Sequence, residues 1–126
     1  MSVKDEYAEI VKQLVEEEKK CLPELPDYWE TSPAINAEIA LFTRDLRETV
    51  QFLDNDCTAE QLIWLSEVFE EISAKLQSWE FIDALKKAAD RLSEECKPHR
   101  ICDFISFAEG QLSPEVYRQR YPNFGK

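Results

Sequence analysis

Apolar residues recur at steps of three and four along almost the whole chain, and this spacing limits the fold more than any other feature. Such steps place side chains on one face of an α-helix. No segment alternates with period two for long enough to indicate a strand, and no Asn-Gly or Asp-Gly hairpin turn occurs. With only two glycines in 126 residues, few tight turns are available. The sequence therefore predicts an all-α protein.

Five to six amphipathic helices are expected, and capping residues mark where most of them begin. A Ser-Pro pair precedes the second and the last helix, and a Thr-x-x-Gln capping box precedes the third. The expected segments are residues 3–20, 33–53, 58–76, 78–92, 101–112 and a short one from Pro114 that stops before Pro122. The buried stripe of the fifth helix is expected to contain Ile101, Phe104, Ile105, Ala108 and Leu112.

Residues 21–32 interrupt the helical spacing, because Pro23 and Pro26 lack an amide hydrogen and disfavour helical geometry in the residue before them. We expect a loop there, fixed against the core by Tyr28 and Trp29. Short connections between amphipathic helices favour antiparallel neighbours. The expected architecture is a single compact domain over residues 1–126, either a bundle or a short superhelical array of helices.

The formal net charge of −11 excludes several classes of partner. Nucleic-acid phosphates and anionic membrane surfaces both attract basic proteins, so neither is an expected ligand. No apolar run approaches the roughly 18 residues of a membrane-spanning helix, and the amino end does not resemble a secretory signal. We therefore expect a cytoplasmic protein whose four cysteines are reduced thiols.

Residue types that carry chemistry are sparse, and we expect neither an enzyme nor a cofactor. Glycines at only two positions rule out the common phosphate-binding loops. His99 is the only histidine available as a base or ligand. It lies between Cys96 and Cys102, but structural zinc requires four ligands, so no metal is expected. A metal-dependent enzyme that uses these residues or nearby carboxylates is retained as an alternative.

Negative charge concentrates in the middle of the chain. Residues 48–83 contain nine carboxylates and one lysine, a formal balance of −8. On a continuous third helix, at about 100° per residue, several of these acids lie opposite the core stripe. With two aspartates that precede the helix they form the predicted partner-binding surface: Asp54, Asp56, Glu60, Ile63, Trp64, Glu67, Glu70 and Glu71.

Two features of this surface favour a binding role. Glu67 and Glu71 are four residues apart, a like-charge spacing that costs about 0.2–0.5 kcal/mol in a helix, so stability alone does not select it. Ile63 and Trp64 would be apolar anchors within an acidic surround, an arrangement suited to a basic protein. Alternatively, both residues pack against another helix and the acids form only a solvated face.

Three stretches, WLSEVFEEI at 64–72, FIDALKKAA at 81–89 and FISFAE at 104–109, resemble the small helical immunity proteins of bacterial toxin systems. The resemblance covers roughly residues 58–112 and contains no strict motif. Such proteins, including those of contact-dependent growth inhibition loci, bind a cognate toxin domain in the cytoplasm and block it, often by covering a nuclease active site. The group shares no catalytic residues, so the resemblance implies a role without assigning site residues.

The expected function is therefore that of a non-enzymatic immunity protein whose partner is a basic toxin domain, with a nuclease as the leading class. A nuclease must present positive charge to its phosphate substrate, and an acidic protein can compete for that surface. The alternative is a protein-interaction adaptor or regulator without a toxin partner. The identity of the toxin, the mode of inhibition and the oligomeric state are left open by the sequence.

Overall fold

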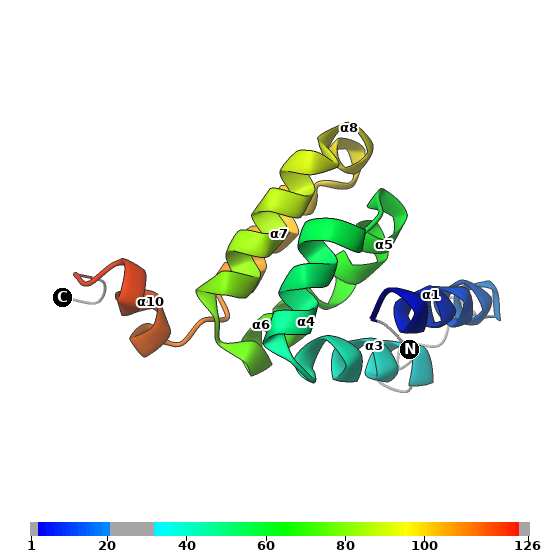
Figure 1. The fold of residues 1–126 in the computed structure, drawn as a ribbon, viewed down its shortest axis with the longest axis horizontal. Helices are drawn as coiled ribbons and strands as arrows, with labels where there is room; N and C mark the ends of the chain where they lie inside the picture. The colour runs from blue at the N-terminus through cyan, green and yellow to red at the C-terminus, as the bar shows by residue number, and fades with distance from the viewer. Residues whose placement is uncertain (1–2, 21–31, 124–126) are drawn as a thin grey trace.

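The computed structural model describes residues 3–20 and 32–123, and all regular secondary structure in them is helical (Figure 1). The prediction of an all-α protein is confirmed for this part of the chain. The predicted loop, with Tyr28 and Trp29, lies outside the described residues apart from Ser32. The helices are α1 (Val3–Lys20), α3 (Pro33–Thr43), α4 (Leu46–Gln51), α5 (Ala59–Leu65), α6 (Phe69–Leu76), α7 (Trp79–Arg91), α8 (Ser93–Cys96), α9 (Ile101–Glu109) and α10 (Pro114–Arg120). Three further turns are helical: the π-helical η1 (Phe52–Asp56) and the 3-10 segments η2 (Ser66–Val68) and η3 (Lys97–His99).

Helix starts coincide with the capping residues that the sequence provides. Thr58 and Gln61 form the reciprocal capping box, in which Thr58 Oγ1 accepts from the Gln61 amide at 3.2 Å and Gln61 Oε1 accepts from the Thr58 amide at 3.0 Å. Each bond satisfies an amide that has no partner within the helix. Side-chain caps also occupy the predicted positions Ser32 and Ser113, and the Ser78 hydroxyl caps α7.

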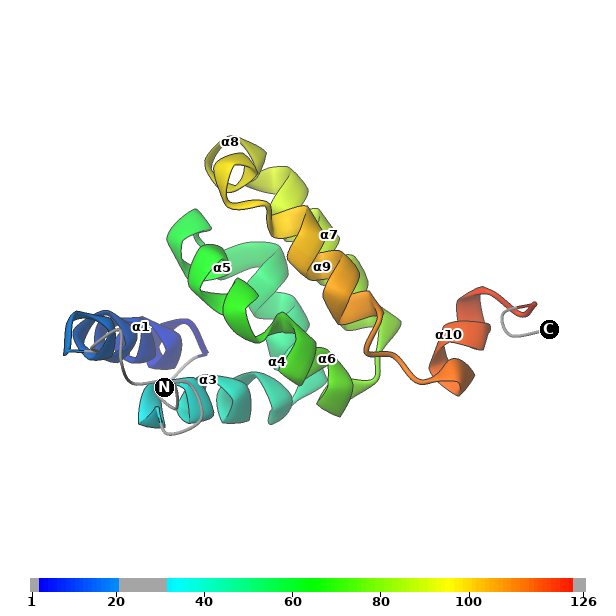
Figure 2. The ribbon, with the colours of Figure 1, turned by 180° about the vertical axis from the view of Figure 1, so that it is seen from behind.

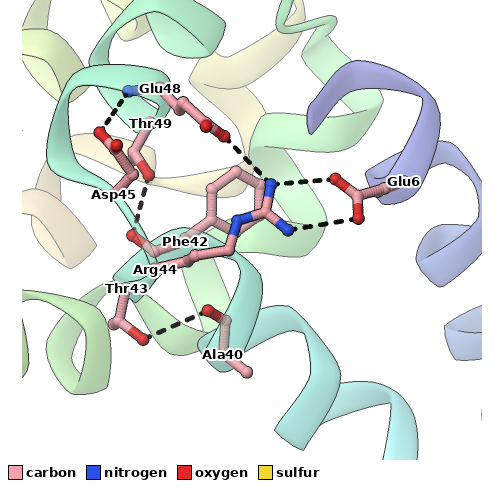
Figure 3. A network of polar contacts seen from close by, with 8 residues as sticks. All are labelled: Glu6, Ala40, Phe42, Thr43, Arg44, Asp45, Glu48 and Thr49. Carbon is pink, nitrogen blue, oxygen red and sulfur yellow. Dashed lines mark hydrogen bonds and ion pairs between the residues drawn. The ribbon is translucent and has the colours of Figure 1, made fainter. Parts of the chain in front are cut away.

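The predicted second helix, residues 33–53, is divided at Arg44 and Asp45. Asp45 adopts an extended conformation (φ −153°, ψ 115°), and its carboxylate accepts a hydrogen bond from the Glu48 amide, which starts a new helix. Figure 3 shows the Arg44 guanidinium between Glu48 and Glu6, with N–O distances of 3.0 Å to each of these carboxylates. The break therefore lies where an ion-pair network joins this turn to α1.

The predicted third helix, residues 58–76, is also divided. Val68 leaves helical geometry (φ −121°, ψ 13°), and η2 separates α5 from α6. The Ser66 hydroxyl donates to the Ile63 carbonyl at 2.6 Å within this turn. Residues on α5 and α6 consequently do not share one helical cylinder, and the expected count of five to six helices is not matched.

An aromatic cluster joins α1 to the rest of the core. Tyr7 packs edge-on against Phe42 and Phe52, with ring centroids 4.8 and 5.8 Å apart, and all three side chains are at most 1% exposed. Edge-to-face pairs of this kind contribute about 0.5–1.5 kcal/mol beyond the area that they bury. This cluster positions α1 across α3, as Figure 1 shows.

Helix α9 runs parallel to α6, its main neighbour. The Ser73 hydroxyl donates to the Ala108 carbonyl at 2.6 Å, and the Gln77 side chain donates to the Gln111 carbonyl at 2.9 Å. From the first bond to the second, the residue numbers rise in both segments, so the two segments run in the same direction. Figure 2 shows α6 and α9 side by side. The expectation that neighbouring helices are antiparallel therefore fails for this pair.

Helix α10 is attached to the beginning of α7, at the opposite end of the structure from α1 (Figure 1). The rings of Tyr117 and Tyr121 lie 5.4 and 5.8 Å from that of Trp79, and the Arg120 guanidinium lies 4.4 Å from the Trp79 ring centroid. The Trp79 indole also donates to the Val116 carbonyl at 2.8 Å. Trp79 therefore contacts α10 through its ring face and its indole N–H.

Candidate functional site

The eight predicted site residues do not lie on one face. Asp54 lines a shallow hollow of about 160 Å³ between α4 and α7, together with Asp83 and Lys87. Asp56 is exposed in the same π-helical turn, and Glu60 is exposed in the first turn of α5. Figure 1 has α4 and α7 on its near side, whereas the reverse view in Figure 2 brings α6 and α9 forward. The hollow that Asp54 lines and helix α6, which carries Glu70 and Glu71, thus lie on opposite sides of the molecule.

Ile63 and Trp64 are half-buried and pack against the hydrophobic core. The sequence predicts them as free apolar anchors, with packing on another helix as the alternative. Their burial agrees with the alternative, because a side chain already packed in the core has less apolar area left for a partner. Any anchor for a partner must then come mainly from other residues.

Glu67 lies in η2, where it faces α1. Burial raises the pKa of its carboxyl group, and the negative charge of Glu18 on α1 raises it further. Glu67 in turn raises the pKa values of Tyr7 and Glu38, which lie in the contact between α1 and α3. This carboxylate therefore lies beside other acidic groups.

Glu70 and Glu71 begin α6. The Gln111 side chain donates to Glu70 Oε2 at 3.2 Å, which joins the carboxylate to the segment that follows α9. Glu71 Oε2 is buried and has no hydrogen-bond partner among the described residues. Burial raises the pKa of Glu71, and the charge of Glu70 adds to the effect. Glu67 precedes these two acids in the chain, and η2 and α6 both pack against α9, while the Glu67 side chain faces α1.

Two phenylalanines on α9 supply exposed aromatic surface that the sequence analysis missed. Phe104 is 36% exposed and Phe107 is 53% exposed, with their rings edge to face and 6.2 Å apart. The placement of Phe104 in the buried stripe was wrong: Ile101, Ile105 and Ala108 form that stripe. The sequence contains a signal for this exposure, because Phe104 and Phe107 are three residues apart and Phe107 lies outside the predicted core stripe.

The aromatic pair lies on α9, which packs directly against α6 and η2. Gln111 follows α9 in the chain, and its side chain binds Glu70 of α6. We call the carboxylates of η2 and α6, together with the two exposed phenylalanines of α9, the acidic-aromatic surface: Glu67, Glu70, Glu71, Phe104 and Phe107. Two adjacent exposed aromatic rings on one helix and carboxylates on the elements packed against it provide both parts of a protein-binding site, an anchor of large contact area and a charged surround.

The side chains that could bind a metal ion do not cluster in residues 3–20 and 32–123. No group of three His, Cys, Asp or Glu side chains is placed there to hold a metal ion. Cys57 and Cys96 are buried free thiols, Cys102 is an exposed free thiol, and Cys21 lies outside the described residues. Cys96 and Cys102 line an apolar hollow of about 270 Å³ beside α8, with Lys97 and Arg100 at its edge.

Comparison with known proteins gives no match to a family model, to a curated protein sequence or to a solved structure. Among the described helices, none combines the length and the apolar character that are needed to cross a membrane. The functional proposal accordingly stands on the geometry and chemistry of the acidic-aromatic surface.

Proposed function

We propose that this chain is a non-enzymatic immunity protein that binds and neutralises a basic bacterial toxin domain in the cytoplasm, with a nuclease as the leading class of toxin. The observation that supports the proposal is the exposed Phe104-Phe107 pair on α9, the helix that packs against α6 and its carboxylates. In this proposal residues 1–126 act as one helical unit that presents the acidic-aromatic surface to the toxin.

The chemistry of the surface suits a nuclease in particular. A nuclease active site is lined with cations because its substrate is a polyanion. Carboxylates that approach those cations can raise the association rate by about 10–1,000 fold at low salt. Aromatic anchors supply affinity by excluding water from a packed contact. The acids would thus select a basic surface, and the phenylalanines would hold it.

The test is binding to the toxin encoded by the neighbouring gene, measured as association and dissociation rates from about 50 to about 300 mM salt. Replacement of Glu67, Glu70 and Glu71 by Gln should slow association at least about tenfold at low salt and flatten the salt dependence. The double substitution Phe104→Ala and Phe107→Ala should accelerate dissociation at least about tenfold.

Glu60→Gln is the matched control, because Glu60 is an exposed acid of α5 outside this surface. Circular dichroism should show that every variant is folded, including the Glu71 variant with its altered buried oxygen. Unchanged rates in both variants would show that the acidic-aromatic surface does not bind the toxin. If the neighbouring gene encodes no toxin and the chain binds a different basic protein through these residues, it is an adaptor or regulator.

A further inference from the structure

A buried carboxyl group lies in the contact between α1 and α3. The side chains of Glu38 on α3 and Tyr7 on α1 are both 0% exposed. The Tyr7 hydroxyl donates to Glu38 Oε1 at 2.5 Å and lies 3.4 Å from the Gln61 carbonyl oxygen of α5. Glu38 Oε2 is buried and has no hydrogen-bond partner among the described residues. The Tyr7-Glu38 pair therefore joins three helices through one hydroxyl group.

The surroundings of Glu38 disfavour its ionised form. From η2, the carboxylate of Glu67 faces it, and Glu67 is itself next to Glu18 of α1. From α1 it faces the Tyr7 hydroxyl, and Cys57, in the turn before α5, acts on Tyr7. None of the groups acting on Glu38 in the described residues is a cation. Burial raises the pKa of Glu38 to about 8, with the Tyr7 hydrogen bond opposing the rise and the charge of Glu67 adding to it.

Protonation makes this buried position tolerable. A neutral carboxyl group keeps Oε1 as the acceptor for Tyr7 and carries no charge into a site that water does not reach. An ionised carboxylate would have a single hydrogen bond, one unpaired oxygen and a like charge nearby, a combination that is strongly unfavourable in a protein interior.

The other polar ties between α1 and α3 lie nearer the surface. Glu6 binds Arg44 at an exposed position near one end of the contact. Near the other end, Glu17 accepts hydrogen bonds from the Ser32 hydroxyl at 2.5 Å and the Ala34 amide at 3.1 Å. From one tie to the next, the residue numbers rise along α1 and fall along α3, so the two helices are antiparallel. Only the central tie, the Tyr7-Glu38 pair, is buried at both of its side chains.

We propose that the Tyr7-Glu38 pair is a proton-operated latch, which holds α1 against the body of the protein while Glu38 is protonated and loosens as Glu38 loses its proton. In the open form, Glu38 reaches water and regains the ordinary carboxyl pKa of 4.5. The closed form therefore binds one more proton than the open form between that value and about pH 8. Glu38 stabilises the closed form most strongly below pH 4.5. This stabilisation weakens as pH rises and no longer changes with pH above about pH 8.

Two measurements test the latch. Urea unfolding from about pH 5 to about pH 9 should give an unfolding constant that rises up to about tenfold per pH unit relative to Glu38→Gln, and then levels off. Hydrogen exchange, corrected for intrinsic rates, should show the same pH dependence for the opening of α1, and this opening should occur without opening of α7. Glu80→Gln, an exposed acid at the start of α7, is the control and should follow the wild-type profile.

Tyr7→Phe keeps the ring packing and removes the donor, so the levelling point should move to higher pH. This variant also serves as the test if Glu38→Gln does not fold. Carboxyl-carbon NMR of Glu38 gives the protonation state directly. The latch is overturned if wild type and Glu38→Gln share the same pH profile, if Glu38 titrates near its ordinary value, or if α1 opens only together with the whole molecule.

Discussion

Thr49 places a hydroxyl group in the core at the junction of α3 and α4. Its side chain is 0% exposed and donates to the Phe42 carbonyl at 2.8 Å. This carbonyl belongs to the last turn of α3, where the helix no longer provides an amide partner. The hydroxyl therefore compensates for the break at residues 44–45.

Thr49→Val should lower the free energy of unfolding by about 1–3 kcal/mol, because the shape is kept while a buried carbonyl loses its partner. Urea denaturation measures the change. Thr43→Val is the matched control: Thr43 is half-buried and donates to Ile39, a carbonyl within its own helix. A change of less than about 0.5 kcal/mol is expected there. Equal losses in both variants would contradict this role of Thr49.

The cysteines differ in burial, and this should determine their reactivity. Cys57 is 2% exposed, and burial raises the pKa of its thiol to about 12. Cys96 is 3% exposed, whereas Cys102 is exposed. Because the thiolate is the reactive form, iodoacetamide should modify Cys102 and spare the other two in the folded protein.

Peptide mass spectrometry reads out this difference in a Cys21→Ser background, which removes the thiol outside the described residues. In urea, all three remaining thiols should react at similar rates. Rapid modification of Cys57 in the native protein would show that the core around η1 opens far more often than its burial indicates.

The sequence locates where helices begin, because capping is local, but it does not show which distant helices pack together. Thr58 and Ser113 each accept a hydrogen bond from an amide three residues away, so the sequence alone locates the helix starts. Asp45 caps α4 in the same way, and the D-x-x-E spacing to Glu48 was a missed signal. Val68 offers no comparable signal, because no capping side chain marks η2 or the start of α6.

The division of helices also explains what was missed in the site. A helical wheel over residues 58–76 assumes one straight cylinder, and η2 invalidates it between Glu60 and Glu67. The acids of α6 were correctly placed outside the core stripe. The aromatic half of the surface could not be connected to them, because α9 is brought to α6 by the parallel packing of these two helices, which the sequence does not show.

Attachment of α10 to α7 should depend on acid pH. Arg120 binds Asp83 through two N–O contacts of 2.8 Å, and this hydrogen-bonded pairing lowers the pKa of Asp83 below its ordinary value of 3.8. For a carboxyl group with a lowered pKa, the stabilising effect is present above the ordinary value and is lost as pH falls through the lowered one. The ring contacts with Trp79 are insensitive to pH and should keep part of the attachment.

The Trp79 indole N–H, which donates to Val116, is a local probe of this attachment. Its NMR resonance should shift towards that of free indole as the pH is lowered below about 4. Asp83→Asn should show a smaller shift of the same kind at neutral pH, with little further change on acidification. Glu80→Gln should behave as wild type, and an unchanged Asn variant would contradict a role for this ion pair.

The carboxylates that lie outside the acidic-aromatic surface still contribute to the long-range electrostatic field of the whole protein. The net charge is −11, and acids such as Asp54 and Glu80 lie on the α4–α7 side. Exposed charges act over about 10 Å at 0.1 M salt, so distant acids influence approach far more than the final contact.

These two contributions should separate in kinetics with the toxin encoded by the neighbouring gene. Replacing Asp54, Asp56 and Glu80 by their amides should slow association by less than about tenfold at low salt, leave dissociation unchanged, and have no effect at about 300 mM salt. Phe104→Ala should leave association unchanged and accelerate dissociation at both salt concentrations, because an anchor contributes only once it is packed. If the distant acids alter dissociation as strongly as Phe104 does, the contact lies on the α4–α7 side and the acidic-aromatic surface is not the binding site.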